Sequence, residues 1–278
     1  MEALNVDKRP WFRQGGIKIA LTIAGSDSGG GAGIQADLKT FHQFGVFGTS
    51  VLVAITAQNT RGVRAVHAVP VDTVRAQMAA LAEDLPPDGT KTGMLATRAL
   101  VEAVADGIRE HGFPGYVLDP VMVATSGDRL LDRDAERSIA ERLVPLATVV
   151  TPNLDEARIL VERDLRTPQD LEDAGRTLVR LGAKAALVKG GHLDGTEVVD
   201  VLVTAAAVRP FRHPRIDTTS THGTGCTLSA AIAAGLARGA SLDQAVAGAL
   251  DFVHRAIQWA PGLGAGHGPL NHFVDPPR

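Results

Sequence analysis

Apolar and polar positions follow two alternating patterns along the chain. Short, almost wholly apolar runs, typical of strands buried on both faces of a sheet, occupy residues 17–24, 50–56, 91–95, 116–118, 148–151 and 184–188. Longer segments with apolar residues at helical spacing predict helices at residues 34–44, 71–85, 97–111, 133–146 and 242–259, and another after Thr167-Pro168. Runs at 197–203 and 207–211 are predicted to pair as antiparallel strands at the sheet edge. This alternation predicts a doubly wound α/β fold.

A glycine turn in the C-terminal half opens into a helix and carries the strongest chemical signal. Gly223 and Gly225 bracket Thr224, and a helical apolar stripe follows at Leu228, Ala231, Ile232, Gly235 and Leu236. Backbone N–H groups converge in such a turn, and the helix N-terminus adds partial positive charge, so a phosphoryl group is the expected guest. Cys226 lies in the first turn, where the same field favours a thiolate acting as general base or nucleophile. Alternatively, the glycines only form a loop and Cys226 is a small buried apolar residue.

A second glycine-rich turn, residues 25–33, follows the first predicted strand and indicates close backbone approach to a ligand. Residues 31–36 match the dinucleotide fingerprint G-x-G-x-x-A, but the acidic residue expected at the end of the second strand is absent. A Walker A loop is also absent, because neither Lys39-Thr40 nor Lys91-Thr92 follows the required glycine. The turn therefore predicts a ligand contact that is neither that of the dinucleotide fingerprint nor that of a Walker A loop.

Two polar positions near this turn suit recognition of a small ring. Gln58 and Asn59 follow the second predicted strand, at the sheet edge where α/β proteins bind ligands, although Asn59 is equally suited to a turn. Asp37 shares the apolar side of its helix with Ile34 and Phe41, so its carboxylate needs a partner. The alternative for Asp37 is an acid stabilised by the dipole of the helix N-terminus.

Charged and amide side chains also follow the later strands. Asp119 ends one strand, where a cation could be held. Asn153 and Glu156 begin the helix after another strand and are candidates to order Mg²⁺ through water. Lys189 follows a further strand beside two glycines and suits a phosphate. The alternatives are an Asp-Pro turn, a capping box between Asn153 and Glu156, and a surface lysine. We also interpret residues 121–131 as a lid over this edge.

Composition narrows the expected class of protein, its partners and its location. The chain has 278 residues, 45% of them hydrophobic, and a net charge of −3 without blocks of like charge, so we expect one globular domain with small-molecule partners and neither nucleic acid nor membrane. Its single cysteine excludes an internal disulfide and a multi-cysteine metal site. We recognise no secretory signal in residues 1–16 and no apolar run of membrane-spanning length, and we expect a cytoplasmic protein.

Taken together, seven motifs resemble one enzyme family. They span residues 25–37, 57–60, 92–95, 119–122, 151–153, 189–192 and 221–229. In this order they are similar to hydroxymethylpyrimidine/phosphomethylpyrimidine kinases of thiamine biosynthesis, members of the ribokinase-like superfamily. The resemblance runs from about residue 17 to residue 273 and leaves residues 1–16 as an N-terminal extension before a single kinase domain, 17–278.

The resemblance implies a fold and an activity. The fold is a ribokinase-like three-layer αβα sandwich with a central mostly parallel sheet and an antiparallel edge, and the family tends to form homodimers. The activity is ATP-dependent phosphorylation of 4-amino-5-hydroxymethyl-2-methylpyrimidine and then of its monophosphate, with Mg²⁺.

The resemblance also implies roles for individual residues. Gln58 and Asp37 would hydrogen-bond the aminopyrimidine, in a pocket lined by Gly25, Ala32, Met94 and Val121. The anion hole would comprise Gly223, Thr224 and Gly225, with Lys189 near the ATP phosphates and Asp119, Asn153 and Glu156 around magnesium. Cys226 stands where sugar kinases of the superfamily carry an aspartate base, so we expect it to deprotonate the hydroxyl in the first step.

Two other functions compete with this one. A pyridoxal or pyridoxine kinase is the nearest, because relatives with a similar glycine-cysteine loop act on that ring, but Gln58 favours an aminopyrimidine. A regulator that binds without catalysis is disfavoured because Asp37, Lys189, Asn153, Glu156 and Cys226 occur together.

Overall fold

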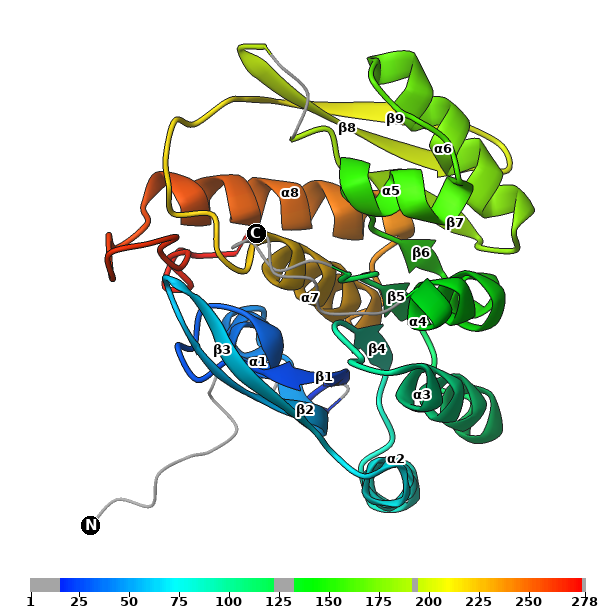
Figure 1. Cartoon of the computed structure of the whole chain (residues 1–278). Helices are drawn as coiled ribbons and strands as arrows, with labels where there is room; N and C mark the ends of the chain where they lie inside the picture. The colour runs from blue at the N-terminus through cyan, green and yellow to red at the C-terminus, as the bar shows by residue number, and fades with distance from the viewer. Residues whose placement is uncertain (1–15, 123–132, 192–194, 277–278) are drawn as a thin grey trace.

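The computed structural model of the protein describes residues 16–122, 133–191 and 195–276 (Figure 1). Almost all of the expected N-terminal extension and most of the expected lid at 121–131 lie outside these ranges, as does His192. Among the helices that are described, none combines the length and the apolar character that a membrane span requires.

The described strands form one nine-stranded sheet in the order β3-β2-β1-β4-β5-β6-β7-β8-β9. Their bounds are β1 Ile19–Ser26, β2 Phe47–Asn59, β3 Gly62–Ala68, β4 Gly89–Thr92, β5 Tyr116–Leu118, β6 Val149–Val150, β7 Ala185–Val188, β8 Glu197–Thr204 and β9 Val208–Pro214. The run from β2 to β7 is parallel, whereas β3 at one edge and β8 and β9 at the other pair antiparallel.

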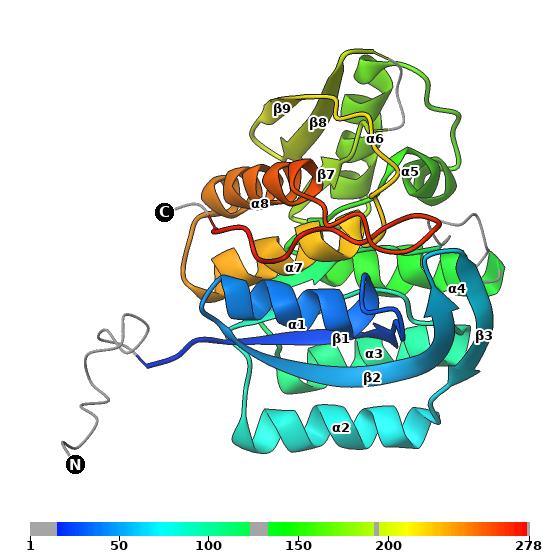
Figure 2. The ribbon, with the colours of Figure 1, turned by 90° about the vertical axis from the view of Figure 1, so that its left-hand side faces the viewer.

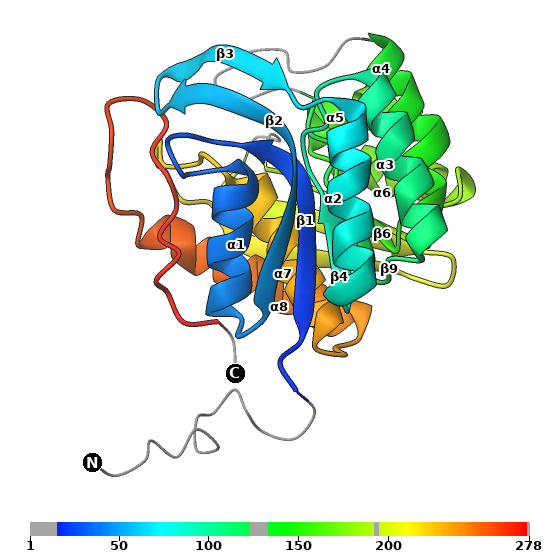
Figure 3. The same ribbon diagram turned by 90° about the horizontal axis from the view of Figure 1, so that it is seen from below.

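Helices cover both faces of this sheet. Their bounds are α1 Gly33–Gln43, α2 Val71–Asp84, α3 Arg98–His111, α4 Arg133–Ser138, α5 Leu154–Val161, α6 Pro168–Arg180, α7 Thr224–Ala237 and α8 Leu242–Gln258. Helices α1, α7 and α8 pack on one face and α2 to α6 on the other (Figures 1 and 3). The expected three-layer αβα sandwich with a mostly parallel sheet and an antiparallel edge is therefore confirmed.

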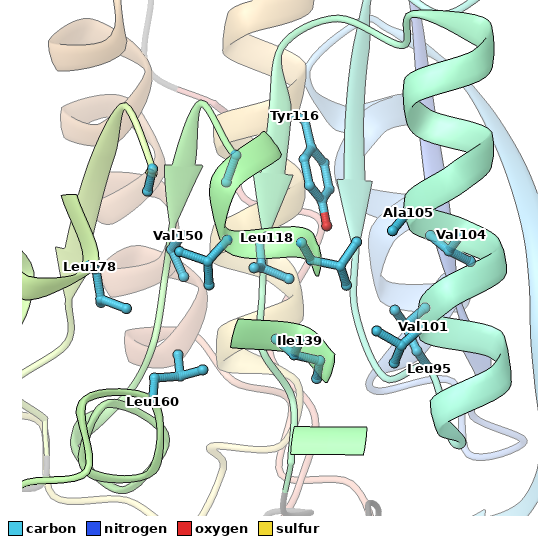
Figure 4. Close-up of a cluster of buried hydrophobic side chains, with 14 of the residues drawn as sticks. Leu95, Val101, Val104, Ala105, Tyr116, Leu118, Ile139, Val150, Leu160 and Leu178 are labelled. Atoms are coloured by element: carbon cyan, nitrogen blue, oxygen red, sulfur yellow. The ribbon is translucent and has the colours of Figure 1, made fainter. Parts of the chain in front are cut away.

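Each face of the sheet has its own apolar core. The core under α2 to α6 includes side chains of α3, β5 and the turn after α4, among them Val101, Leu118 and Ile139 (Figure 4). The second core joins Phe41 of α1 to the small residues of α7 and to Phe252 of α8. Together they bury the central strands on both faces, which explains the uninterrupted apolar runs of the sequence.

The prediction and the structure differ at two elements. Strand β3 was not predicted, because its outer positions are exposed and its sequence mixes charged with apolar residues. The helix predicted over residues 133–146 is instead α4 followed by a π-helical turn, Ile139–Leu143, and a 3₁₀ turn, Val144–Leu146. Pro145 explains the break, because proline cannot donate the hydrogen bond that an α-helix requires at that position.

Candidate active site

A cavity of about 810 Å³ opens at the carboxyl ends of the parallel strands. The last residues of β2, the turns after β1, β4, β5, β6 and β7, and the start of α7 all contribute to its wall. Its lining includes all but one of the residues to which the resemblance gives a role: Gly25, Ala32, Gln58, Met94, Asp119, Val121, Asn153, Glu156, Lys189, Gly223, Thr224, Gly225 and Cys226. The exception is Asp37.

The first turn of α7 forms the centre of the cavity wall. Gly223 is the N-cap with φ +83°, a conformation that favours glycine, and a Cβ there would clash with the carbonyl oxygen of Gly31. Among the described residues, no side chain caps this helix end. A helix leaves its first N–H groups without intrahelical partners, so Gly225 and Cys226 present a positive end to the cavity.

The Cys226 thiol faces this same space. The backbone N–H of Gly33, the first residue of α1, donates to the sulfur. Burial nevertheless raises the pKa of Cys226 to about 12, because the favourable Lys91 charge does not offset desolvation and the carboxylates of Asp37 and Asp119. Desolvation therefore opposes the thiolate that the N-terminus of α7 is expected to favour.

A hydrogen-bonded group closes one end of the cavity. His222 Nε2 lies 2.8 Å from Asp27 Oδ2 and 3.4 Å from Gln58 Nε2. Asp27 also accepts hydrogen bonds from the backbone N–H groups of Gly29, Gly31 and Ala32 at 2.8 to 3.0 Å. The pKa of Asp27 lies below its ordinary value, because the hydrogen bond to His222 and the N–H groups of Gly29 and Ala32 outweigh burial. An ionised Asp27 thus fixes the imidazole beside Gln58.

The C-terminal segment, red in Figure 2, supports this end. The backbone N–H of His222 donates to the carbonyl oxygen of Gly268 at 3.1 Å, and His222 pairs with Pro269 in a short bridge. The sequence analysis assigned no role to His222 or Asp27, although both lie inside the two glycine motifs. Their partnership joins residues 195 positions apart, which no local pattern predicts.

Acidic and basic groups meet at the middle of the cavity. Lys189 Nζ lies 3.6 Å from Asp119 Oδ1 and 4.0 Å from Glu156 Oε2. Burial raises the pKa of Glu156 to about 7, although the nearby Lys189 charge favours the carboxylate. Asn153 and Glu156 form a capping box at α5, which is the alternative to a magnesium site that the sequence analysis left open for this pair. Both side chains also line the cavity.

The other end of the cavity is formed by β9 and α8. The rings of His213 and His254 stack there with centroids 5.4 Å apart, beside apolar side chains of α8 that include Val253 and Ile257. Asp200 of β8 also lines this end and accepts a hydrogen bond from the Gly190 N–H at 2.9 Å, and burial raises its pKa to about 6. The sequence analysis assigned no role to any of these residues, because an edge strand and the last helix bring them together.

Asp37 lies outside the cavity lining, completely buried behind it. Its carboxylate accepts hydrogen bonds from Lys91 Nζ at 2.8 Å and from Thr22 Oγ1 at 2.6 Å. The partner that the sequence required for Asp37 is thus Lys91, which the sequence analysis considered only as part of a missing Walker loop.

Comparison with known proteins identifies the family. The family model described as phosphomethylpyrimidine kinase matches residues 27–271. The chain belongs to the phosphomethylpyrimidine kinase family.

Relatives in this family cover nearly the whole chain. A hydroxymethylpyrimidine/phosphomethylpyrimidine kinase of Rhizobium meliloti is 52% identical over 258 residues, which are 92% of this chain and 97% of that one. The solved phosphomethylpyrimidine kinase of Clostridium difficile is similar with TM-score 0.78 and 40% identity, covering 86% of this chain and 99% of that one. The solved ADP complex of a Bacillus subtilis pyridoxal kinase has TM-score 0.86 and 40% identity, covering 92% and 97%. The protein is accordingly a phosphotransferase with a ribokinase-like fold.

Proposed function

We propose that the protein is an ATP-dependent kinase that phosphorylates 4-amino-5-hydroxymethyl-2-methylpyrimidine and then its monophosphate to the diphosphate. One observation carries the proposal: a single cavity is lined by the Gln58 amide, the Cys226 thiol, the N-terminus of α7 and Lys189. Membership of the phosphomethylpyrimidine kinase family and the 52% identity to the Rhizobium enzyme support the same substrate.

The aminopyrimidine binds against Gln58. A side-chain amide offers both a donor and an acceptor, which matches the exocyclic amino group and the adjacent ring nitrogen of the substrate. The Gln58 amide is held between Thr56 Oγ1, 3.3 Å from its oxygen, and the His222 ring. The ring of the substrate packs in the apolar wall formed by Gly25, Ala32, Met94 and Val121.

Phosphoryl transfer takes place at the start of α7. The substrate hydroxyl attacks the γ-phosphorus, and the bond from phosphorus to the bridging oxygen breaks as ADP leaves. Gly223, Thr224 and Gly225 form the anion hole, in which the Thr224 N–H also donates to the Thr221 carbonyl oxygen at 3.3 Å. Lys189 binds the phosphates, and Cys226 accepts the hydroxyl proton. We place ATP at the end with His213 and His254. The ADP complex of the similar Bacillus kinase supports binding of an adenine nucleotide by this fold.

Magnesium fits the acidic side of the cavity. No cluster of three or more His, Cys, Asp or Glu side chains able to hold a metal occurs within residues 16–122, 133–191 and 195–276. Mg²⁺ keeps several waters and needs few protein ligands, so Asp119 and Glu156, with Asn153, suit an ion held through water. An ion bound there would neutralise phosphate charge during transfer.

The remaining features are proposed as follows. Residues 17–278 form one kinase domain that acts in the cytoplasm, with small molecules and neither nucleic acid nor membrane as partners. We place a homodimer contact at β3, an edge strand whose side chains are largely exposed and which includes Val66 at 47% exposure. An exposed edge strand favours pairing with a further strand.

The deciding experiment measures ATP-dependent products by mass spectrometry, with the hydroxymethylpyrimidine and pyridoxal offered separately in the presence of Mg²⁺. Mono- and diphosphate from the pyrimidine are the expected products. Preference for pyridoxal would overturn the substrate assignment, leaving the phosphate site in place but removing the proposed role of Gln58.

Gln58→Leu tests the pyrimidine contact. Loss of the amide leaves polar groups of the bound ring unpaired, so kcat/KM with the hydroxymethylpyrimidine should fall about 10- to 200-fold, or about 1–3 kcal/mol. KM for ATP should change little, since Gln58 lies at the opposite end of the cavity from His254. Steady-state kinetics with each substrate varied in turn provides the measurement, and a larger effect on ATP than on pyrimidine would contradict this placement.

Glu156→Gln tests the magnesium site. Glutamine keeps an oxygen that accepts from the Asn153 N–H, so the capping box survives and the melting temperature should change little. Loss of the negative charge should raise the Mg²⁺ concentration for half-maximal activity about tenfold. A Mg²⁺ titration of the rate at saturating ATP measures this, with Asp155→Asn, on the same helix turn, as the control.

A further inference from the structure

The side-chain amide of Gln58 lies between two polar groups of the cavity wall. Its nitrogen lies 3.4 Å from His222 Nε2, and its oxygen lies 3.3 Å from Thr56 Oγ1. The Gln58 backbone is held separately, because Ser28 Oγ donates to its carbonyl oxygen at 2.7 Å and accepts from its N–H at 2.8 Å. The two side-chain contacts therefore decide which end of the amide faces which neighbour.

The proton on the ring of His222 is fixed by Asp27. His222 Nε2 lies 2.8 Å from Asp27 Oδ2. The same oxygen accepts from the backbone N–H groups of Gly31 at 3.0 Å and Ala32 at 2.9 Å, as expected of a carboxylate and not of a protonated acid. His222 Nε2 therefore carries a proton and donates a hydrogen bond to Asp27. Because that nitrogen is a donor, it cannot accept a hydrogen bond from the Gln58 amide.

The hydroxyl of Thr56 is fixed in the same way on the other side of the amide. It donates to the carbonyl oxygen of Ser26 at 2.8 Å, which leaves Oγ1 as an acceptor toward Gln58. The amide thus has a donor at His222 and an acceptor at Thr56. Half a turn of the amide about its last bond brings its oxygen to the ring and its nitrogen to the hydroxyl, so that both ends are paired. The two ends are nearly identical in shape, and the turn therefore needs no extra space.

We propose that His222 is a positioning residue that fixes the orientation of the Gln58 amide, with the amide oxygen toward the ring and the nitrogen toward Thr56. The inference rests on the proposed kinase function. The second lone pair of the oxygen and the second N–H of the amide remain for the substrate. They match the 4-amino group and N3 of the aminopyrimidine. The ring cannot turn over to exchange these groups, because its 5-hydroxymethyl group is directed at Cys226.

A fixed amide makes the site selective for one order of donor and acceptor on the ring. The compound 5-hydroxymethyl-2-methylpyrimidin-4(3H)-one reverses that order, because its C4 oxygen accepts and its N3–H donates, while the ring and the reacting hydroxyl are kept. Against the fixed amide, oxygen would meet oxygen and N–H would meet N–H. For the native chain, kcat/KM with this compound should therefore be at least about 10²-fold lower than with the aminopyrimidine.

Replacing His222 tests the selectivity by steady-state kinetics with the two pyrimidines offered separately. His222→Leu removes the donor and allows the amide to turn, so the ratio of kcat/KM between the aminopyrimidine and the pyrimidinone should fall to less than about tenfold. His222→Gln is the conservative variant. Its side-chain amide can donate to Asp27 and to Gln58, and it should retain at least about a third of the native ratio.

The ratio separates positioning from a structural role. If His222 only supported the turn, His222→Leu would lower kcat/KM for both pyrimidines by the same factor, and an unchanged ratio would overturn the proposal. Lys39→Met is the matched control. It removes a hydrogen bond of 2.6 Å to the Gly30 carbonyl oxygen in the same glycine turn, but no donor or acceptor of Gln58, and should keep the native ratio.

A second variant reports on the other side of the amide if His222→Leu does not fold. Thr56→Val keeps the shape of the side chain but removes the acceptor for the Gln58 nitrogen. The selectivity ratio should fall about two- to tenfold, which corresponds to one lost hydrogen bond. A native ratio in Thr56→Val would count against the assigned orientation.

A measurement without substrate keeps this inference distinct from the proposed function. Two-dimensional ¹H–¹⁵N NMR of the native chain distinguishes the tautomers of each histidine ring, and the spectrum of His222→Gln identifies the signals of His222. A proton on Nε2 is expected near neutral pH, and a ring protonated on Nδ1 alone would overturn the inference. A native chain that phosphorylates neither pyrimidine would refute the proposed function, while the NMR result would still decide whether His222 presents a donor to Gln58.

Discussion

Cys226→Ala is expected to slow phosphorylation of the hydroxymethylpyrimidine about 10²- to 10⁴-fold, which is the usual contribution of a general base. Phosphorylation of the monophosphate should fall by less than about tenfold, because its attacking oxygen is already ionised near neutral pH and needs no base. Separate assays of the two steps, each started with its own substrate, measure the difference. Equal losses in both steps, in this variant or in Cys226→Ser, would contradict a role for the thiol as base.

The pH dependence of the native protein gives the same test a second readout. Burial raises the pKa of Cys226 to about 12, so the thiol form dominates near pH 7 and the thiolate fraction grows about tenfold per pH unit. A base must be deprotonated, and kcat/KM of the first step should therefore rise between about pH 7 and pH 9. The second step should be nearly flat in this range, since the second pKa of a phosphate monoester is about 6. Cys226→Ala should abolish the rise in the first step.

The sequence predicts the layers of this fold well because the central strands are buried on both faces. Such strands are continuous apolar runs, as in β1 and β7, and the helices between them begin at recognisable caps such as Thr167. Strand β3 was not predicted because it is an edge strand with exposed side chains, and such a strand needs no apolar run. Strand β3 pairs with β2 because the two-residue turn Thr60-Arg61 places the two strands side by side.

Some features of the candidate site could likewise be predicted from the sequence, and others could not. Residues that follow parallel strands, such as Asp119 and Lys189, could be placed from the sequence, because these strand ends meet at one edge of the sheet. Contacts between distant elements could not: Lys91 lies 54 positions from Asp37, and His213 meets His254 across β9 and α8. The desolvation that raises the pKa of Cys226 could not be predicted either, since burial is a property of the tertiary structure, whereas the helix dipole is a local one.

Gly225→Ala should abolish both phosphorylations, with kcat lowered about 10²- to 10³-fold, the effect of losing an anion-hole contact. A Cβ at this position would lie 3.2 Å from Lys189 Nζ and 3.5 Å from Asp119 Oδ2. The methyl group would thus stand between the N-terminus of α7 and Lys189, where we place the transferring phosphoryl group. Both steps transfer the same group, so kcat should fall equally in both. In Cys226→Ala, by contrast, the first step should lose more activity than the second.

Stability should not fall with activity in this variant. Gly225 is helical without a positive φ, and alanine is favoured over glycine inside a helix by about 0.5–1 kcal/mol, so Gly225→Ala should melt no lower than the native protein. Gly191→Ala is the matched control, because a Cβ there meets no atom of the described residues within 4 Å and its φ is not positive. Gly223→Ala provides the contrast, since its Cβ would clash with the Gly31 backbone and destabilise the loop itself. A folded Gly225→Ala protein that retained more than about a tenth of the native rate in either step would show that the phosphoryl group is transferred elsewhere in the cavity.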